Sequence, residues 1–156
     1  MTTSRDVAEW LKSHDDLLIL THLHPDGDAL GSSLALCLAL ESIGKRAAVC
    51  CQDGCPGYLD ALPARDRLHL PEGLPFEPKA LACVDLSVAD RLGRAAFLLD
   101  RGLPVCCVDH HEHPALAAEV RLVNPQAAAS GELIDEIRRA LDVPLTREMA
   151  LCLYVA

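Results

Sequence analysis

The chain has 156 residues, which is within the usual size of one domain and enough for a hydrophobic core of its own. Hydrophobic residues make up 51% and charged residues 24%, so the composition indicates a globular protein, and 3% aromatic residues imply an aliphatic core. The net charge of -9 argues against a nucleic-acid coat or an anionic membrane surface as the main partner, because both require a basic field. Every apolar run is shorter than the roughly 18 residues needed to span a bilayer, which excludes a membrane protein.

The eight cysteines are predicted to be free thiols. The first residues lack the basic region and apolar run of a secretory signal, so we expect the reducing cytoplasmic compartment rather than a disulfide framework. Cys51 and Cys55 have the spacing of half a zinc site, but no second pair of ligands follows at a matching distance. All cysteines except Cys55 lie in apolar stretches and are predicted to be small core residues: Cys37, Cys50, Cys51, Cys83, Cys106, Cys107 and Cys152.

The first half of the chain predicts a helix over residues 3–14, capped by Thr3 or Ser4, and a buried strand over 17–21. A long helix follows over 29–42 and ends at Gly44, and a second strand covers 46–51. Residues 53–57 are dense in turn residues. The segment 63–78 contains four prolines and is predicted to be an irregular connection within the domain.

The second half predicts strands over residues 81–84, 104–108 and 120–123, with a short helix over 95–100. A further helix covers 130–140, capped by Ser130, and the last helix begins after Thr146. Strands and helices that alternate in this way predict an α/β fold with a doubly wound, mostly parallel sheet flanked by helices.

Three of the predicted strands end at carboxylate or imidazole groups. The carboxyl ends of parallel strands meet at one edge of the sheet, so these groups should converge on one crevice. Each cluster alone could be a solvated turn, but three together favour a site for Mn²⁺, Mg²⁺, Fe²⁺ or Zn²⁺, and paired ions of this kind hydrolyse phosphoesters. The residues are His22, Asp26 and Asp28 after the first strand, Asp85 after the third, and Asp109, His110 and His111 after the fourth.

The order of these motifs resembles the DHH phosphoesterase family, especially its nanoRNase and phosphoadenosine-phosphate phosphatase branch. The resemblance covers residues 17–156 and implies a cytoplasmic, manganese-dependent catalytic domain that hydrolyses short oligonucleotides or phosphoadenosine phosphate. Ser130-Gly131-Glu132 is similar to the helix start of that branch. The other matching motifs are His22-x-His24-Pro25-Asp26-Gly27-Asp28-Ala29-x-Gly31-Ser32, then Asp85 with Asp90-Arg91-x-Gly93, then Asp109-His110-His111.

The resemblance implies a separate task for each metal-ligand candidate. His22 and Asp26 would bind one Mn²⁺, Asp28 and His110 would bind the other, and Asp85 would bridge both; Mg²⁺ or another divalent ion suits the same ligands. A hydroxide held by the ions would attack phosphorus in line.

The same resemblance assigns His111 to the scissile phosphate and Asp109 to the orientation of the histidines. Ser32, at the predicted start of its helix, and Gly131 are candidate substrate contacts through free backbone N–H groups. Ser130 either caps its helix or contacts the substrate. His24 is predicted to be a polar loop residue or a substrate contact, and His113 to be solvated or near the ligands.

The departure from the family pattern lies at the end of the chain. Members of the branch have a further Asp, in an Asp-Thr-Gly type motif, shortly beyond the segment that matches residues 153–156, and then a DHH-associated substrate-binding domain. The sequence shows neither, so we expect 1–156 to be a catalytic domain that is incomplete at its C-terminus. The prediction is that this chain holds the first ion better than the second and has weak or no activity alone.

Two kinds of alternative remain open. One is another enzyme of the superfamily, such as a RecJ-like exonuclease, a cyclic-dinucleotide phosphodiesterase or a manganese pyrophosphatase. The other is a non-catalytic regulatory module that binds a nucleotide or a metal. The sequence leaves open the metal identity, the preferred substrate and the oligomeric state, including a homodimer.

Overall fold

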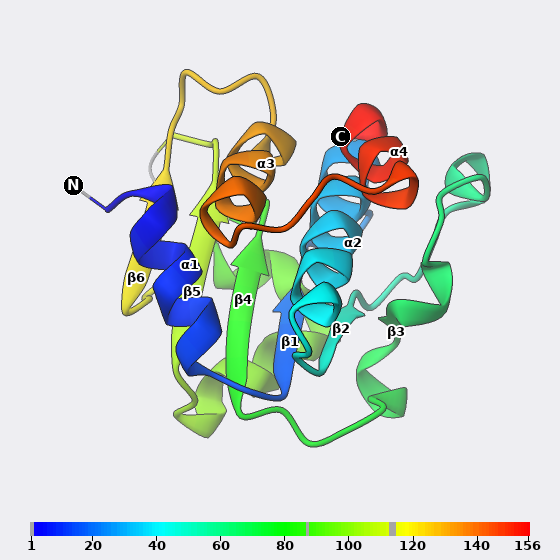
Figure 1. Ribbon diagram of the computed structural model, residues 1–156. Coiled ribbons are helices and arrows are strands. Elements are labelled where there is room, and N and C mark those ends of the chain that lie inside the picture. Colours follow the sequence, from blue (N-terminus) through cyan, green and yellow to red (C-terminus); the bar gives the residue numbers. More distant parts are fainter. Residues whose placement is uncertain (1, 87, 113–114) are drawn as a thin grey trace.

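A computed structural model describes residues 2–86, 88–112 and 115–156, and its centre is a six-stranded, all-parallel sheet (Figure 1). The strand order is β3-β2-β1-β4-β5-β6, which confirms the predicted doubly wound α/β class. The strands are β1 (Leu17–Leu20), β2 (Ala47–Cys50), β3 (Leu68–His69), β4 (Ala80–Val84), β5 (Val105–Asp109) and β6 (Val120–Val123). The α-helices are α1 (Ser4–Ser13), α2 (Gly27–Ser42), α3 (Ser130–Ala140) and α4 (Arg147–Val155).

The order in which successive strands are added to the sheet reverses between β1 and β4. From β1 the chain adds β2 and β3 on one side, and from β4 it adds β5 and β6 on the other. β1 and β4 are paired in register from Leu17 with Ala80 to Leu20 with Cys83. In open parallel sheets the crevice for a ligand lies at such a switch, beyond the carboxyl ends of the two strands.

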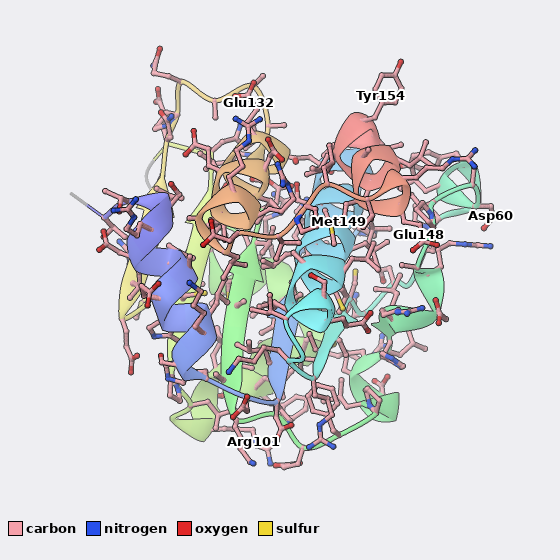
Figure 2. The ribbon with its side chains drawn as sticks, viewed as in Figure 1. Asp60, Arg101, Glu132, Glu148, Met149 and Tyr154 are labelled. Atoms are coloured by element: carbon pink, nitrogen blue, oxygen red, sulfur yellow. The ribbon has the colours of Figure 1, made fainter. Side chains whose placement is uncertain are left out.

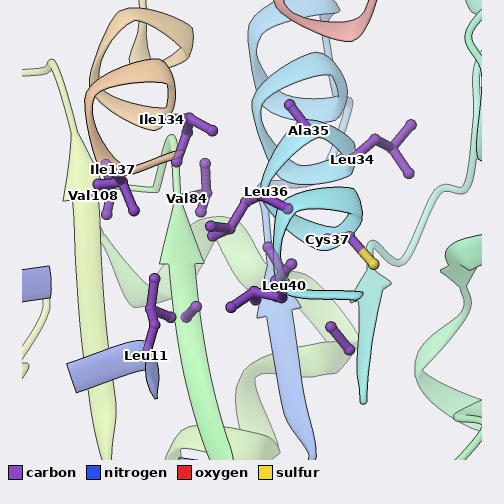
Figure 3. Close-up of a cluster of buried hydrophobic side chains, with 14 of the residues drawn as sticks. Leu11, Leu34, Ala35, Leu36, Cys37, Leu40, Val84, Val108, Ile134 and Ile137 are labelled. Carbon is purple, nitrogen blue, oxygen red and sulfur yellow. The ribbon is translucent and has the colours of Figure 1, made fainter. Parts of the chain in front are cut away.

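Each face of the sheet packs against its own hydrophobic cluster because neighbouring strand residues point to opposite faces. Leu17 and Ile19 of β1 belong to the cluster covered by the four α-helices, whereas Leu18 and Leu20 belong to the cluster on the other face. That second face is covered by the 3₁₀ segment η4 (Ala89–Arg101). Figure 3 shows Ile134 and Ile137 of α3 beside Val84 and Val108 of the strands, with leucines of α2 next to them in the first cluster.

Close approach of α4 to α2 depends on two glycines one helical turn apart. A Cβ atom on Gly31 would lie 2.4 Å from the carbonyl oxygen of Cys152, and one on Gly27 would lie 2.5 Å from that of Val155. Other residues of α4 are divided between core and surface: Met149 is buried, whereas Tyr154 projects from the end of the helix (Figure 2). α4 therefore packs against the N-terminal half of α2, which directly follows the loop that carries the predicted metal ligands.

The structure corrects four details of the sequence prediction. Residues 68–69, inside the supposed irregular segment, form the edge strand β3, which pairs with β2. The helix predicted over 95–100 is the longer 3₁₀ segment η4, with a kink at Gly93, whose φ is 56°. α2 begins at Gly27 rather than at residue 29, because Asp26 caps it. The N-cap of α3 is Ala129 and not Ser130.

Other predictions are confirmed or fall outside the described residues. Thr3 caps α1 in a reciprocal arrangement with Asp6. The seven cysteines predicted in the core are all buried, and the Cys51 thiol donates to the carbonyl oxygen of His22. His113 lies outside the described residues. None of the helices in the described ranges has the length and apolar character needed to cross a membrane.

Candidate metal centre

The three predicted strand ends meet at the switch between β1 and β4. The loop after β1 carries His22 and Asp26, Asp85 directly follows β4, and Asp109 is the last residue of β5. Asp85 stands at the centre of the group, with a φ of 54°, a left-handed conformation that is uncommon and costly for a residue other than glycine. Its backbone N–H donates to the carbonyl oxygen of Val108, so pairing with β5 helps to hold it there.

The two oxygens of the buried Asp85 carboxylate face different partners. Oδ2 lies 3.3 Å from Nε2 of His22. Oδ1 lies 3.8 Å from Nε2 of His110 and 3.5 Å from Nδ1 of His111. The Ser130 hydroxyl donates to Oδ1 over 3.1 Å, which restrains the carboxylate from the α3 side. One carboxylate is thus shared between two groups of imidazoles.

His22 is almost fully buried and is held by its other ring nitrogen. Nδ1 lies 2.8 Å from the carbonyl oxygen of Leu23 and 3.0 Å from Nη2 of Arg91. Nε2 is directed to the carboxylates, 3.3 Å from Asp85 and 4.0 Å from Oδ1 of Asp26. This division, with one nitrogen held by the protein and one facing a carboxylate cluster, is typical of a metal-binding histidine.

Asp28 receives three hydrogen bonds from the protein. The Ser32 hydroxyl and the Gly131 N–H donate to Oδ1, over 2.7 and 3.1 Å, and the Ser130 N–H donates to Oδ2 over 2.8 Å. Oδ2 also lies 3.4 Å from Nε2 of His110. Oδ1 accepts two hydrogen bonds and Oδ2 accepts one, so Oδ2 is the oxygen more open to an ion.

These contacts give the predicted substrate residues a different immediate task. Ser32, Ser130 and Gly131 are all buried, and their polar groups bond to Asp28 or Asp85 rather than facing open space. The expectation that Ser32 lies at a helix start with a free N–H group is wrong, because α2 begins five residues earlier. Direct contact of these three residues with a substrate stays a prediction.

Asp109 fixes the histidine pair that follows β5. Its Oδ1 accepts from the backbone N–H groups of His110 and His111, over 2.7 and 3.1 Å, and lies 2.7 Å from Nδ1 of His111. Nδ1 of His110 lies 3.3 Å from the carbonyl oxygen of Ala127, so its Nε2 is the nitrogen that faces Asp28 and Asp85. Asp109 is fully buried, and its Oδ2 has no hydrogen-bond partner within the described part of the chain.

The carboxylates and imidazoles of the centre shift the pKa values of one another. Burial raises the pKa of Asp85, but the hydrogen bond and the charge of His22, together with the charge of His111 and the hydrogen bond from Ser130, outweigh burial, so the net pKa is lowered. Burial likewise lowers the pKa of His22, while its bonds to Asp85 and Leu23 raise it to a net increase. Burial and the negative charge of Asp85 raise the pKa of Asp28. A cation between these carboxylates would relieve that repulsion.

The donor set fits divalent cations. Two groups have ligand atoms within 4.8 Å of one another: His22, Asp26 and Asp85, and then Asp85, His110 and His111. Asp85 belongs to both, as a bridging ligand would. Oxygen and imidazole donors without a thiolate suit Mn²⁺, Mg²⁺, Fe²⁺ or Zn²⁺. The second group contains His111, which the sequence assigned to the phosphate, whereas Asp28 reaches the centre through its contact with His110.

Sequence reasoning missed two residues beside the centre. Arg91 contacts His22 with its guanidinium, and its carbonyl oxygen accepts from the N–H of Leu23 over 2.7 Å. Asp53 accepts from the N–H of His24 over 2.7 Å and braces the same loop. Arg91 lies within a motif noted in the sequence, so a signal for it existed. Nothing in the sequence links Asp53 to a loop 29 residues earlier.

The chain belongs to the DHH family. Residues 16–156 match the N-terminal domain of the DHH family. Over 153 residues the chain is 34% identical to a bifunctional oligoribonuclease and PAP phosphatase, NrnA, from Thermus thermophilus, covering 94% of this chain and 44% of the relative. It is also 27% identical over 143 residues to the uncharacterized protein MJ1633 from Methanocaldococcus jannaschii, covering 88% of this chain and 29% of that protein.

A solved structure has the same fold. An exopolyphosphatase-related protein from Bacteroides fragilis superposes with a TM-score of 0.87 at 24% sequence identity, covering 97% of this chain and 48% of the other. The chain thus spans less than half the length of each of these three proteins.

Proposed function

We propose that the protein is a phosphoesterase that hydrolyses short oligonucleotides or phosphoadenosine phosphate with the help of two Mn²⁺ ions. The observation that carries the proposal is the shared carboxylate of Asp85, whose oxygens face His22 on one side and His110 with His111 on the other. Family membership and the identity with the Thermus oligoribonuclease favour this activity over a non-catalytic module.

In this proposal His22 and Asp26 hold one ion, Asp28 and His110 hold the other, and Asp85 contacts both. The contacts of His22 with both carboxylates and of His110 with Asp28 support the division. Bound ions would supply positive charge against the phosphate and lower the pKa of a water molecule. Because Oδ1 of Asp28 accepts hydrogen bonds from both Ser32 and Gly131, this residue would bind through Oδ2, the more open oxygen.

The remaining residues of the centre hold the metal ligands and His111 in position. Asp109 anchors His111 by Nδ1, which leaves Nε2 as the ring nitrogen for the scissile phosphate, and the His111 side chain is 42% exposed. Ser130 restrains Asp85 through its hydroxyl, and the carbonyl oxygen of Leu23 restrains His22 at Nδ1. Residues held in this way keep the ligands in place before substrate arrives.

The compartment and the domain organisation belong to the same proposal. All eight cysteines are free, which supports a reducing compartment such as the cytoplasm. The chain corresponds to 44% of the Thermus relative. We therefore assign the choice between oligonucleotide and phosphoadenosine phosphate to the DHH-associated domain that the family resemblance implies, and the activity to the complete protein.

The decisive assay uses the complete protein with Mn²⁺ and two substrates, the dinucleotide pApA and phosphoadenosine phosphate. Chromatography should detect AMP from both substrates, and a phosphate assay should detect phosphate from the second. The variant Asp85→Asn, close in shape, should retain the circular dichroism spectrum and fall to background activity. Wild-type protein that releases neither product, or a fully active Asp85→Asn variant, would contradict the proposal.

Metal stoichiometry tests the division of ligands in the chain described here. Equilibrium dialysis with Mn²⁺ should show one tight ion and one weaker ion per chain, because the family resemblance predicts a further Asp at the second site. Two equally tight ions would contradict this asymmetry without touching the assignment of the fold.

A further inference from the structure

Tyr58 places an exposed aromatic ring beside the metal centre. It lies in the 3₁₀ turn η1 (Gly57–Leu59), in the connection that follows β2 and thus starts at the carboxyl edge of the sheet. Tyr58 is one of only five Tyr, Phe and Trp residues in the chain, and it is 73% exposed. Its hydroxyl donates over 3.3 Å to the carbonyl oxygen of Pro25, the residue directly before Asp26.

The ring borders a hollow of about 250 Å³ next to the loop that carries the metal ligands. His24, whose side chain is 85% exposed, lines the same hollow. The carboxylate of Asp53 holds this histidine in place by accepting from its backbone N–H over 2.7 Å and by lying 3.5 Å from its Nδ1. The hollow is therefore shaped by fixed groups: His24, Pro25, Asp53, Pro56 and Tyr58.

The chemistry of the lining favours a nucleobase over a phosphate. Of the five lining residues none is Lys or Arg, and the carboxylate of Asp53 would repel an anion. The rings of Tyr58 and His24 provide flat aromatic surfaces on which a base can stack, and stacking accepts any base because every base has a π-face. Asp53 can also accept a hydrogen bond from an exocyclic amino group.

Tyr58 also borders a second hollow, of about 150 Å³, between η1 and α4. Its lining of Leu59, Leu62, Leu151 and other small or apolar residues has no charged group. Of these two hollows, only the first is lined by residues of the loop that carries His22 and Asp26. When the phosphate of a nucleotide lies at the metal centre, its base can therefore reach the first hollow.

We propose that the hollow between Tyr58 and His24 is a nucleobase subsite, in which a base of the substrate stacks on the ring of Tyr58. This inference rests on the proposed function, because it assumes that a nucleotide phosphate binds at the metal centre. It adds that the catalytic domain itself recognises the base, through a residue outside the metal-ligand motifs.

The test measures stacking directly with the complete protein and a 5′-phosphorylated dinucleotide of 2-aminopurine, whose fluorescence is quenched when the base stacks. A non-hydrolysable methylenephosphonate linkage between the two nucleotides prevents turnover while Mn²⁺ is present. Wild-type protein should quench the probe, and Tyr58→Ala should bind it about 5- to 150-fold more weakly, which is the range for the loss of one base stack. Tyr58→Phe keeps the ring and should stay close to wild type.

Two controls make the result specific. Tyr154→Ala removes the other tyrosine, which is 88% exposed on α4 and does not line the hollow, and it should bind like wild type. A dinucleotide with abasic sites in place of the bases should bind wild type and Tyr58→Ala equally. Tyr58 is exposed and lies outside the core clusters, so its removal should leave the fold intact.

The outcomes separate this inference from the proposed function. Protein that quenches the probe through Tyr58 but hydrolyses no substrate with Mn²⁺ would support the subsite and overturn the activity. Protein that hydrolyses pApA, while Tyr58→Ala matches wild type in quenching and in KM, would overturn the subsite and leave the activity standing. A wild-type protein that neither binds nor quenches the probe would also overturn the subsite.

Discussion

The backbone N–H of Ser130 donates to Oδ2 of Asp28 across 102 residues of sequence, over 2.8 Å. The bond links the first turn of α3 to the first turn of α2, and the positive end of a helix dipole favours a carboxylate at such a place. Asp28 is thus oriented by three donors before any ion is bound. These three hydrogen bonds are therefore made by the fold and do not depend on a bound metal ion.

Removal of the Ser32 hydroxyl should weaken binding of the second ion. In Ser32→Ala, Oδ1 of Asp28 loses its shortest hydrogen bond, of 2.7 Å, and only two backbone N–H groups still orient the carboxylate toward His110. Loss of a partner that orients a metal ligand typically costs about 10- to 100-fold in metal affinity. We expect the weaker of two Mn²⁺ dissociation constants to rise within that range, measured by electron paramagnetic resonance of free Mn²⁺.

Ser33 provides the matched control. Its hydroxyl is buried and has no hydrogen-bond partner within the described residues, so Ser33→Ala removes no contact with the centre. Replacement of an unpaired buried hydroxyl by a methyl group should leave stability unchanged or raised. Equal Mn²⁺ affinities for the two alanine variants would contradict the positioning role of Ser32.

The sequence could predict that the strand ends converge, because that information is local. The residues that follow β1, β4 and β5 are contiguous with apolar runs, and parallel strands bring such ends together without further detail. The convergence of Asp85 with His22 and His110 could therefore be expected from position alone. The bonds that Ser130 and Gly131 donate to Asp28 could not, because they depend on the packing of α3 against α2.

The parts of the fold that were predicted wrongly depend on tertiary packing. β3 has two residues and no periodic pattern of its own, and it exists because β2 offers an edge for pairing. η4 turns sharply at Gly93 where Gln52 approaches; a Cβ there would lie 2.1 Å from its side-chain oxygen. Single-sequence patterns carry no record of such contacts.

Replacement of Gly31 by alanine should separate α4 from α2. The new Cβ would lie 2.4 Å from the carbonyl oxygen of Cys152, which is backbone and cannot rotate aside. Overpacking of this kind lowers the free energy of unfolding by about 1–3 kcal/mol. The higher helix propensity of alanine offsets at most roughly 1 kcal/mol of that loss, so we expect Gly31→Ala to be destabilising. Urea denaturation measures the difference. Gly73→Ala, with nothing within 4 Å of its Cβ, should change stability by less than about 0.5 kcal/mol.

The folded protein should present one reactive thiol. Cys55 is half-buried, while the other seven cysteines are buried. Burial raises the pKa of Cys37 and of Cys50 to about 12, which leaves almost no thiolate at pH 8. We expect one fast equivalent with Ellman's reagent in buffer and eight in guanidinium chloride, and none of the fast phase in Cys55→Ser. Two or more fast thiols in the native protein would contradict the described core.

Asp16 should make stability depend on pH in the acid range. Hydrogen bonds from Arg46 (2.5 Å) and then Lys79 (2.9 Å) lower the pKa of this carboxyl to about 2. Because the folded pKa lies below the unfolded value of about 4, the contribution is fully present above that value and is lost as pH falls through about 2. Asp16→Asn should therefore lower the melting temperature at pH 7 and match wild type near pH 2.

The substitution tests charge rather than backbone strain. Asp16 has a φ of 51°, and asparagine tolerates this left-handed conformation about as well as aspartate. The difference at pH 7 should shrink in 1 M NaCl, because salt screens ion pairs with the exposed ends of Arg46 and Lys79. A difference in melting temperature that is equal at pH 7 and near pH 2 would show that the carboxylate charge does not contribute, and the ion pairs at the start of β1 would then be dispensable.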